Sequence, residues 1–338
     1  MRIATLPCIL LLTLAAGAAL AATATPDRYS PSEKKEQTVS APSFSVGELR
    51  KAPALPAAGV SFIDASDGVA LAYRAYVPAA PRAVLLFYHG GGAHSGAGYQ
   101  HIGHGLQQRF RIAVYTPDIR GHGASGGPRG DAPTPRRVWD DIGVLIRHVR
   151  AAHPGLPLIL GGHSSGAGLV LNYASQPGHE PVDGYVFVSP QLGPHGHADR
   201  PGIAAPFATV DVQPFIANAM SGGRLQGHTP AVRFNYSPEV LAADAGMVAS
   251  YTVNMSNAVT PAKPREQFEN LDRPYGLWIG AEDELFLPEK VLAVGAPSPA
   301  LRAACELVIV AGAKHLSILL SAHESIGPWI ERRAGTGG

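Results

Sequence analysis

A pentapeptide, Gly162-His-Ser-Ser-Gly166, lies between two apolar runs and leaves this chain few ways to fold. The run before it, residues 157–161, has the length and composition of a buried strand, and the run after it, residues 167–174, has helical spacing. A chain that passes from strand to helix within five residues must turn tightly, and the two glycines leave room for that turn. Such a turn projects Ser164 from the end of a sheet.

Short apolar runs alternate with longer amphipathic stretches along most of the chain. Runs that are apolar on both faces are typical of strands buried in a parallel sheet, and the stretches between them have helical spacing. Ahead of these runs, Asp67-Gly68 separates two alternating segments and predicts an antiparallel hairpin. We therefore predict an α/β fold with a mostly parallel eight-stranded sheet flanked by helices. The predicted strands span residues 60–64, 69–77, 83–88, 112–116, 158–161, 185–188, 277–280 and 306–310.

The alternation stops between residues 191 and 270, where Pro, Gly and scattered aromatic residues replace it. We predict a cap insertion there, after the sixth strand, so that the core comprises residues 58–190 and 271–338. The large aromatic and methionine side chains of the insertion are candidates for an acyl pocket or for a small core of its own. They are Phe207, Phe215, Met220, Phe234, Tyr236, Met247, Tyr251 and Met255.

The N-terminal residues have the pattern of a secretory signal peptide. Met1-Arg2 provides a positive start, residues 3–20 are almost uncharged, and Ala19-Leu20-Ala21 supplies small residues for cleavage. We predict a signal peptide over residues 1–21 and export to the periplasm or the medium, with an uncleaved membrane-anchoring helix as the alternative. Residues 22–57 show little apolar periodicity and are predicted to form a flexible arm.

The composition limits the classes of partner. Hydrophobic residues make up 46% of the chain and charged residues only 16%, which indicates a packed globular protein. The 27 Lys and Arg residues nearly balance the 26 Asp and Glu residues, so a net charge of +1 gives no basic surface for nucleic acid. We therefore expect no nucleic-acid partner, and the oligomeric state stays open.

A serine hydroxyl becomes a strong nucleophile beside a base that removes its proton, and that base needs a carboxylate to orient it. In a strand–turn–helix setting of this kind the chain order is Ser, then Asp or Glu, then His. Behind the seventh strand, Asp283 is the predicted acid, with Glu282 and Glu284 as alternatives. Behind the last strand, His315 is the predicted base, and His323, within a predicted helix, is the alternative.

Acyl transfer also needs backbone amides that stabilise an oxyanion. His89-Gly90-Gly91-Gly92 ends the third strand, and glycine lets a loop approach a substrate closely. We predict the amide of Gly91 as one donor. The amide of Ser165, the residue after the nucleophile, is the predicted second donor.

With these residues in view, the chain resembles the α/β-hydrolase family, and within it the group of monoacylglycerol lipases and lysophospholipases. Residues 89–96 are similar to the oxyanion segment of that group, and residues 118–126 are similar to its D-x-x-G-H-G-x-S loop. Val188-Ser189-Pro190 resembles the exit from its sixth strand. The resemblance implies a Ser-Asp-His triad, no cofactor and carboxylic-ester substrates. Ala93 departs from the group, which often has an acidic residue there.

We therefore predict an exported serine hydrolase that cleaves carboxylic esters through an acyl-enzyme on Ser164. The predicted substrates are a monoacylglycerol, a lysophospholipid, or a short acyl ester or lactone, with a transient contact at a membrane surface. The alternatives are an acyltransferase or serine peptidase with the same triad, and a non-catalytic binding protein on the same fold. No metal site is predicted, because His195, His197 and Asp199 alternate in a loop without a partner cluster of ligands.

Overall fold

The computed structural model describes residue 49, residues 52–203 and residues 206–335. The predicted signal peptide and most of the predicted arm lie outside the described residues. Within the described part of the chain, no helix has the length and apolar character needed to cross a membrane.

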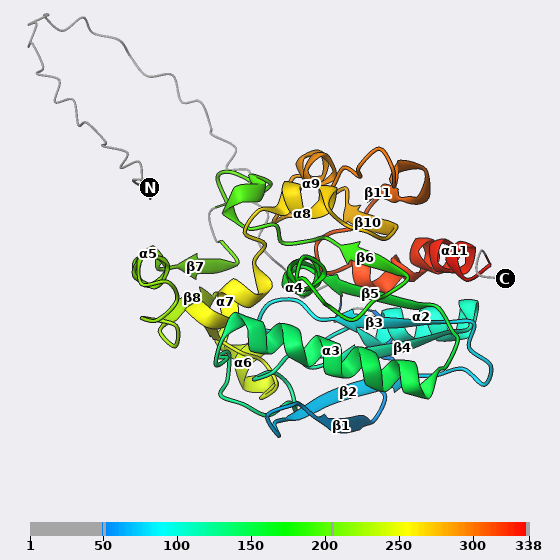
Figure 1. Cartoon of the computed structure of the whole chain (residues 1–338), viewed down its shortest axis with the longest axis horizontal. Helices are drawn as coiled ribbons and strands as arrows, with labels where there is room; N and C mark the ends of the chain where they lie inside the picture. The colour runs from blue at the N-terminus through cyan, green and yellow to red at the C-terminus, as the bar shows by residue number, and fades with distance from the viewer. Residues whose placement is uncertain (1–48, 50–51, 204–205, 336–338) are drawn as a thin grey trace, which may run out of the picture. The chain divides into compact units, whose positions relative to one another are not determined.

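A central sheet organises the protein (Figure 1). Its strands are β1 (Val60–Asp64), β2 (Ala70–Tyr76), β3 (Ala83–Tyr88), β4 (Ile112–Pro117), β5 (Leu158–His163), β6 (Gly184–Val188), β10 (Tyr275–Gly280) and β11 (Glu306–Val310). Their order in space is β1-β2-β4-β3-β5-β6-β10-β11. The pairs β1–β2 and β2–β4 are antiparallel, and all other neighbours are parallel. The predicted mostly parallel eight-stranded sheet is therefore confirmed.

Helices cover both faces of this sheet, as Figure 1 shows. One face carries α2 (Gln100–Phe110), α10 (Ile318–Ser321) and α11 (His323–Ala334). The other carries α3 (Pro135–Ala152), α4 (Ser165–Ala174), α8 (Pro264–Glu269) and α9 (Pro288–Val294). Alternate strand residues face the two cores: Leu86 and Leu160 belong to one, Leu85 and Ile159 to the other. Burial on both faces explains why the strands read as continuous apolar runs.

The insertion between β6 and β10 contains its own small sheet, with the order β7-β8-β9. Its elements are η1 (Pro194–Gly196), β7 (Ala208–Val210), α5 (Val212–Met220), β8 (Pro230–Phe234), α6 (Pro238–Ala243), β9 (Ser250–Thr252) and α7 (Val253–Val259); η2 (Arg302–Ala304) lies beyond it, before β11. The sequence does not predict this sheet, because strands of three residues are too short to show an alternating pattern.

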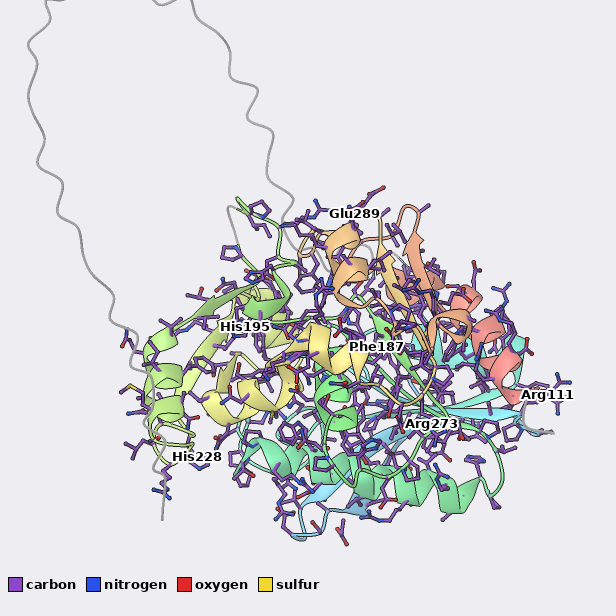
Figure 2. The ribbon with its side chains drawn as sticks, turned by 45° about the horizontal axis from the view of Figure 1, so that its top comes forward. Arg111, Phe187, His195, His228, Arg273 and Glu289 are labelled. Atoms are coloured by element: carbon purple, nitrogen blue, oxygen red, sulfur yellow. The ribbon has the colours of Figure 1, made fainter. Side chains whose placement is uncertain are left out.

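The carboxyl ends of the parallel strands point toward the insertion. Figure 2 shows this polarity, because Arg111, which directly precedes β4, lies on the opposite side of the molecule from His195 and His228 of the insertion. The loops that follow β3, β5, β10 and β11 therefore meet at the edge where ligands of open α/β sheets bind.

Candidate active site

Ser164 occupies the tight turn between β5 and α4. Its backbone angles, φ 53° and ψ −120°, are rare for a residue with a side chain, and strain of this kind concentrates at functional sites. A side-chain carbon at Gly162 would lie 2.4 Å from the Gly166 backbone, and one at Gly166 would lie 2.4 Å from the His89 carbonyl oxygen. Both glycines are therefore required, Gly162 because the turn folds back on its own backbone and Gly166 because the turn packs directly on the loop after β3.

The predicted acid and base are in direct contact. Asp283 follows β10 and His315 follows β11, and these strands are parallel neighbours. Asp283 Oδ2 accepts a hydrogen bond from His315 Nδ1 at 2.9 Å. The second carboxylate oxygen accepts from the amides of Leu285 and Phe286, at 3.0 and 2.9 Å. The carboxylate is thus held in one orientation toward the ring.

Both groups are buried, and each shifts the pKa of the other. Burial disfavours the charged imidazole, but the charge of Asp283 and its hydrogen bond outweigh this, so the pKa of His315 lies above its usual value. Burial also disfavours the Asp283 carboxylate, but His315 and two backbone amides hold its pKa below the usual value. The Nδ1 proton of His315 therefore stays on the Asp283 side, and Nε2 of the neutral ring is the basic atom.

The glutamates on either side of Asp283 take other positions. Glu284 is buried, and its Oε2 accepts a hydrogen bond from the His315 backbone amide at 2.9 Å. Glu282 is exposed. His323, the alternative base, begins α11, where its ring lies beside Arg109 of α2. The carboxylate on the His315 ring is that of Asp283.

His163, the residue before Ser164, links the turn to the base. Its Nε2 donates to the His315 carbonyl oxygen at 2.9 Å, and the two ring centroids are 4.9 Å apart. Burial, with the charge of His315 adding to it, lowers the pKa of His163 to about 3. The His163 ring is therefore neutral, and it places no second positive charge beside His315.

The glycine loop after β3 packs against the same turn. A side-chain carbon at Gly90 would lie 3.2 Å from Ser164 Cβ, and one at Gly91 would lie 2.9 Å from Ser165 Oγ. Among the described residues, the amides of Gly91 and Ser165 donate to no protein acceptor. Ser165 also begins α4, whose N-terminus favours negative charge. These amides therefore lie where an oxyanion formed on Ser164 needs donors.

A largely apolar cavity of about 670 Å³ opens at Ser164. Insertion and core line it together: Val232 of β8 comes from the insertion, and Leu285 and Phe286 come from the loop after β10. Within the described part of the chain, no Asp, Glu, Lys or Arg side chain lines it. Its shape and chemistry suit an apolar group attached to a carbonyl at Ser164.

The large side chains of the insertion divide among cavity, core and solvent. Met255 is fully buried in the core, whereas Met220 is 85% exposed. Tyr236 and Met247 line a neighbouring cavity of about 290 Å³. The cavity at Ser164 is lined by Phe207, Phe215, Phe234 and Tyr251. Each of the two sequence hypotheses, a pocket lining and a core, therefore applies to some of these residues.

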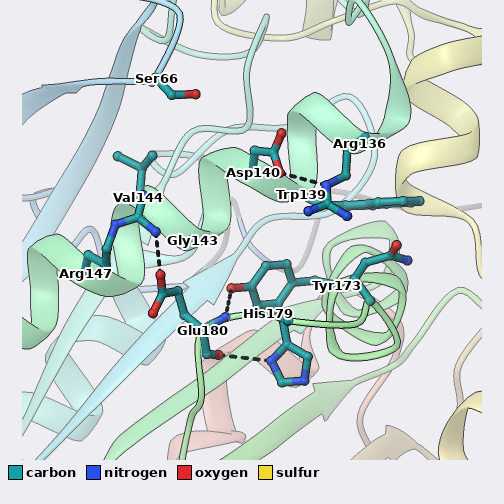
Figure 3. A pocket seen from close by; sticks show the side chains of 12 residues that line it. Ser66, Arg136, Trp139, Asp140, Gly143, Val144, Arg147, Tyr173, His179 and Glu180 are labelled. Atoms are coloured by element: carbon teal, nitrogen blue, oxygen red, sulfur yellow. Dashed lines mark hydrogen bonds and ion pairs between the residues drawn. The ribbon is translucent and has the colours of Figure 1, made fainter.

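A separate polar pocket of about 260 Å³ lies between α3 and the segment after α4 (Figure 3). Its charged groups pair with one another, Arg136 with Asp140 at 2.8 Å and Arg147 with Glu180. Groups that satisfy one another leave no poised base or nucleophile, so this pocket is not the candidate site. Among the described residues, no three His, Cys, Asp or Glu side chains gather as a metal site would require.

The loop after β4 braces the oxyanion segment. Asp118 accepts hydrogen bonds from the amides of Ser95 and Ala124, at 2.7 and 2.8 Å. Arg120 pairs with the buried Asp141 at 2.7 Å. The polar residues of this loop are therefore paired with the backbone and the side chains around them.

Three tyrosine hydroxyls hold the glycine loop, a role that the sequence does not indicate. Tyr99, just before α2, accepts a hydrogen bond from the Gly90 amide at 2.6 Å. The other two, Tyr236 and Tyr251, reach the loop from the insertion. The one signal that points toward them is general: the peptide groups of a buried glycine loop need partners.

The model of the serine aminopeptidase S33 family matches residues 79–318. The chain belongs to this family. Human monoglyceride lipase is 28% identical over 231 residues, which cover 65% of this chain and 72% of the human protein. The monoacylglycerol lipase of Mycolicibacterium smegmatis is 37% identical over 113 residues, which cover 32% of this chain and 39% of that lipase. The second match thus spans less than half of the bacterial enzyme.

A solved structure extends the comparison to the fold. A soluble variant of monoglyceride lipase from Saccharomyces cerevisiae, in complex with a substrate analogue, superposes with a TM-score of 0.62 at 18% identity. The match covers 82% of this chain and 96% of the yeast chain. The predicted resemblance to α/β-hydrolases of the monoacylglycerol lipase type is confirmed, and so is the predicted enzyme class, a serine carboxylic-ester hydrolase.

Proposed function

We propose that this serine carboxylic-ester hydrolase cleaves esters with a medium or long acyl chain, of the monoacylglycerol or lysophospholipid type. The observation that carries the proposal is the apolar cavity of about 670 Å³ at Ser164. Pockets for small organic ligands span roughly 300–1,000 Å³, so this one accommodates a group much larger than acetyl. The identity with human monoglyceride lipase supports the same class of substrate.

In the proposed mechanism, His315 takes the Oγ proton of Ser164 as the oxygen attacks the ester carbonyl carbon. Asp283 stabilises the imidazolium that forms, and the amides of Gly91 and Ser165 stabilise the oxyanion. Collapse of the intermediate breaks the ester C–O bond, and His315 gives its proton to the departing alcohol oxygen. Water then attacks the acyl carbon with His315 again as base, the bond from that carbon to Ser164 Oγ breaks, and His315 returns its proton to Oγ as the carboxylic acid leaves.

The name of the matching family also suggests an aminopeptidase activity, which is the alternative to test beside ester hydrolysis. An aminopeptidase must bind the charged amino group of its substrate, for which a carboxylate is the strong partner. Among the described residues that line the cavity at Ser164, none is Asp or Glu, which favours an ester substrate. Product analysis with a glycerol monoester, an added alcohol acceptor and an aminoacyl amide separates a hydrolase from an acyltransferase and a peptidase.

The proposal is tested with p-nitrophenyl esters from acetyl to palmitoyl, on the purified protein and on Ser164→Ala. We expect kcat/KM to be highest for chains of about eight carbons or more, because these fill the cavity. Ser164→Ala should lose both turnover and labelling by a fluorophosphonate. An optimum at acetyl would contradict the substrate class, and undiminished labelling of Ser164→Ala would contradict the nucleophile.

We also propose a transient contact with a lipid surface through the outer face of the insertion. Five large apolar side chains there are between 48% and 85% exposed: Val210, Val212, Ile216, Met220 and Leu225. Val212, Ile216 and Met220 are spaced four residues apart on α5 and so share one face of that helix, and exposed apolar surface of this kind marks interaction sites. Val210 and Val212 also line the cavity, so the apolar surface continues from solvent to Ser164. Co-flotation of the protein with phosphatidylcholine vesicles tests this contact.

Export is a further proposal, and it rests on the charged, apolar and small-residue pattern over residues 1–21. N-terminal sequencing of the protein recovered from each cell fraction tests it. A mature chain that begins at Ala22 fits a cleaved signal peptide. An intact Met1 in the membrane fraction fits the anchoring helix instead.

A further inference from the structure

Two tyrosines of the insertion hold opposite edges of one peptide unit in the glycine loop. Tyr236 OH donates to the Gly91 carbonyl oxygen at 2.7 Å. The Gly92 amide donates to Tyr251 OH at 2.9 Å. Because this carbonyl and this amide belong to the same planar unit, the two hydroxyls together fix its rotation. We call this pair of contacts the tyrosine clamp.

The preceding peptide unit carries the amide of Gly91. Its carbonyl, that of Gly90, accepts from His89 Nδ1 at 2.9 Å and from the Ala93 amide at 3.3 Å. In a trans peptide the carbonyl and the amide point in opposite directions, so holding this carbonyl directs the Gly91 amide to the other side. Gly91 itself lies against Ser165. The Gly90–Gly91 unit and the clamped Gly91–Gly92 unit share the Cα of Gly91, so the clamp limits the rotations about that atom through which the Gly91 amide could turn away.

A buried histidine determines which way the Tyr251 hydroxyl points. His122 Nδ1 lies 3.0 Å from the Arg120 carbonyl oxygen and must donate to it, since a carbonyl oxygen only accepts. Burial lowers the pKa of His122 well below its usual value, so the ring is neutral and its Nε2 accepts the Tyr251 proton at 2.8 Å. The Tyr251 oxygen is then left to accept from the Gly92 amide.

The other end of the loop is held by the same sequence of groups, built entirely from the core. His163 donates from Nε2 to the His315 carbonyl, so its Nδ1 accepts from Tyr99 OH at 2.9 Å. Tyr99 then accepts from the Gly90 amide. The loop is thus hydrogen-bonded to the core tyrosine at Gly90 and to the insertion at Gly91 and Gly92.

The backbone of the insertion keeps Tyr251 in position. The Val248 amide donates to the Gly92 carbonyl oxygen at 2.8 Å, and the Thr252 amide donates to the Gly130 carbonyl oxygen at 3.0 Å. Gly92 has φ 68°, and a side-chain carbon there would lie 2.6 Å from the Val248 carbonyl oxygen. The segment that carries Tyr251 is therefore attached to the core on both sides of it.

We propose that Tyr236 and Tyr251 are positioning residues for acyl transfer, because the tyrosine clamp directs the Gly91 amide at the oxyanion. The way the insertion packs on the core therefore affects kcat. The inference rests on the proposed function, because it requires an oxyanion on Ser164. Loss of one hydroxyl leaves the Gly91–Gly92 peptide unit free to rotate in part of the molecules, and the Gly91 amide shifts with it. An oxyanion donor contributes about 10²–10³-fold to kcat, and its partial loss is expected to cost about tenfold.

The test compares Tyr251→Phe and Tyr236→Phe with a matched control, Tyr115→Phe. Tyr115 OH also pairs with a histidine, His153 Nε2 at 2.9 Å, but this pair joins β4 to the end of α3. For a p-nitrophenyl ester we expect kcat to fall about tenfold in each clamp variant with KM within about twofold, and the control to keep both values.

Two further measurements sharpen the test. The affinity of each clamp variant for a trifluoromethyl ketone, which mimics the oxyanion, should fall in parallel with kcat. Because both hydroxyls hold one peptide unit, Tyr236→Phe/Tyr251→Phe should lose less than the product of the single losses. Thermal denaturation of each variant checks that the fold is intact.

Three outcomes would overturn the inference: kcat within about twofold of the wild type in both clamp variants, a rise in KM with kcat unchanged, or an equal loss in Tyr115→Phe. The second outcome would assign the tyrosines to substrate binding. Failure of the proposed function looks different, because the wild-type protein would then show no ester turnover that depends on Ser164.

Discussion

The carboxyl edge of the core and the insertion over residues 191–270 differ in what determines the position of their residues. At the core edge the backbone determines the positions: Ser164 lies in a strained turn, and Asp283 and His315 lie on the loops that follow two adjacent strands. In the insertion the strands have only three to five residues, and the positions of its residues depend on how their side chains pack. The proposed chemistry thus rests on a few residues at the core edge, whereas the proposed acyl-binding surface is made of many side chains of the cavity lining.

Two segments of the insertion also differ from each other. The inner segment, residues 244–259, is hydrogen-bonded to the glycine loop and to the loop after β4. The outer segment, residues 206–225, carries most of the exposed apolar side chains of the insertion. We expect substitutions at the core edge, in the cavity lining and in the outer segment to have successively smaller effects on activity.

The largest effect is expected from Asp283→Asn. An amide at this position can donate a hydrogen bond to His315 Nδ1, which favours the wrong tautomer, so kcat should fall about 10³–10⁴-fold with little change in KM. Steady-state kinetics on a soluble p-nitrophenyl ester measure this. Glu282→Gln, at the exposed neighbouring position, is the matched control and should keep its activity. A loss of less than about tenfold in Asp283→Asn would rule out this residue as the orienting acid.

The second-largest effect is expected on the pH dependence of kcat/KM. His315 must be neutral to act as a base, so kcat/KM falls as the pH drops through the pKa of His315. Since Asp283 and Glu284 hold that pKa above its usual value, the acid limb should have its midpoint above about 6.5. Glu284→Gln removes one of these charges and should move the midpoint to lower pH. His163, with its pKa of about 3, contributes no titration there. An unmoved midpoint in Glu284→Gln would show that its charge does not reach the ring.

The core and the insertion also differ in how much of their structure can be predicted from the sequence. In the core, each local pattern has one structural meaning: an apolar run buried on both faces is a strand, and paired glycines around Ser164 make a turn. In the insertion, Tyr236 and Tyr251 contact glycines 145 and 159 residues away. A hydroxyl that bonds to a distant peptide unit leaves no periodicity and no motif, so the sequence places both tyrosines only among candidates for a pocket or a core.

A smaller effect, confined to long substrates, is expected from Val232→Trp. The larger ring fills part of the cavity, so kcat/KM for a dodecanoyl ester should fall about tenfold while the value for a butanoyl ester stays within about twofold. A series of p-nitrophenyl esters measures the shift. Val77→Trp, at a position 41% exposed outside the insertion, is the control. An equal loss at every chain length would show that the acyl chain does not occupy this cavity.

The smallest effect should come from Ile216→Ser and Met220→Ser in the outer segment. Full burial of one such side chain contributes about 1.5–3 kcal/mol, and partial burial at a lipid surface contributes less, so hydrolysis of a monoester in vesicles should fall about threefold to tenfold. Turnover of a soluble ester should be unchanged, because neither side chain lines the cavity within the described residues. Phe62→Ser on β1, 56% exposed at the far edge of the main sheet, is the matched control. Equal losses on both substrates would mean that the substitutions disturb the cavity, and an equal loss in Phe62→Ser would mean that the outer segment has no special role at the lipid surface.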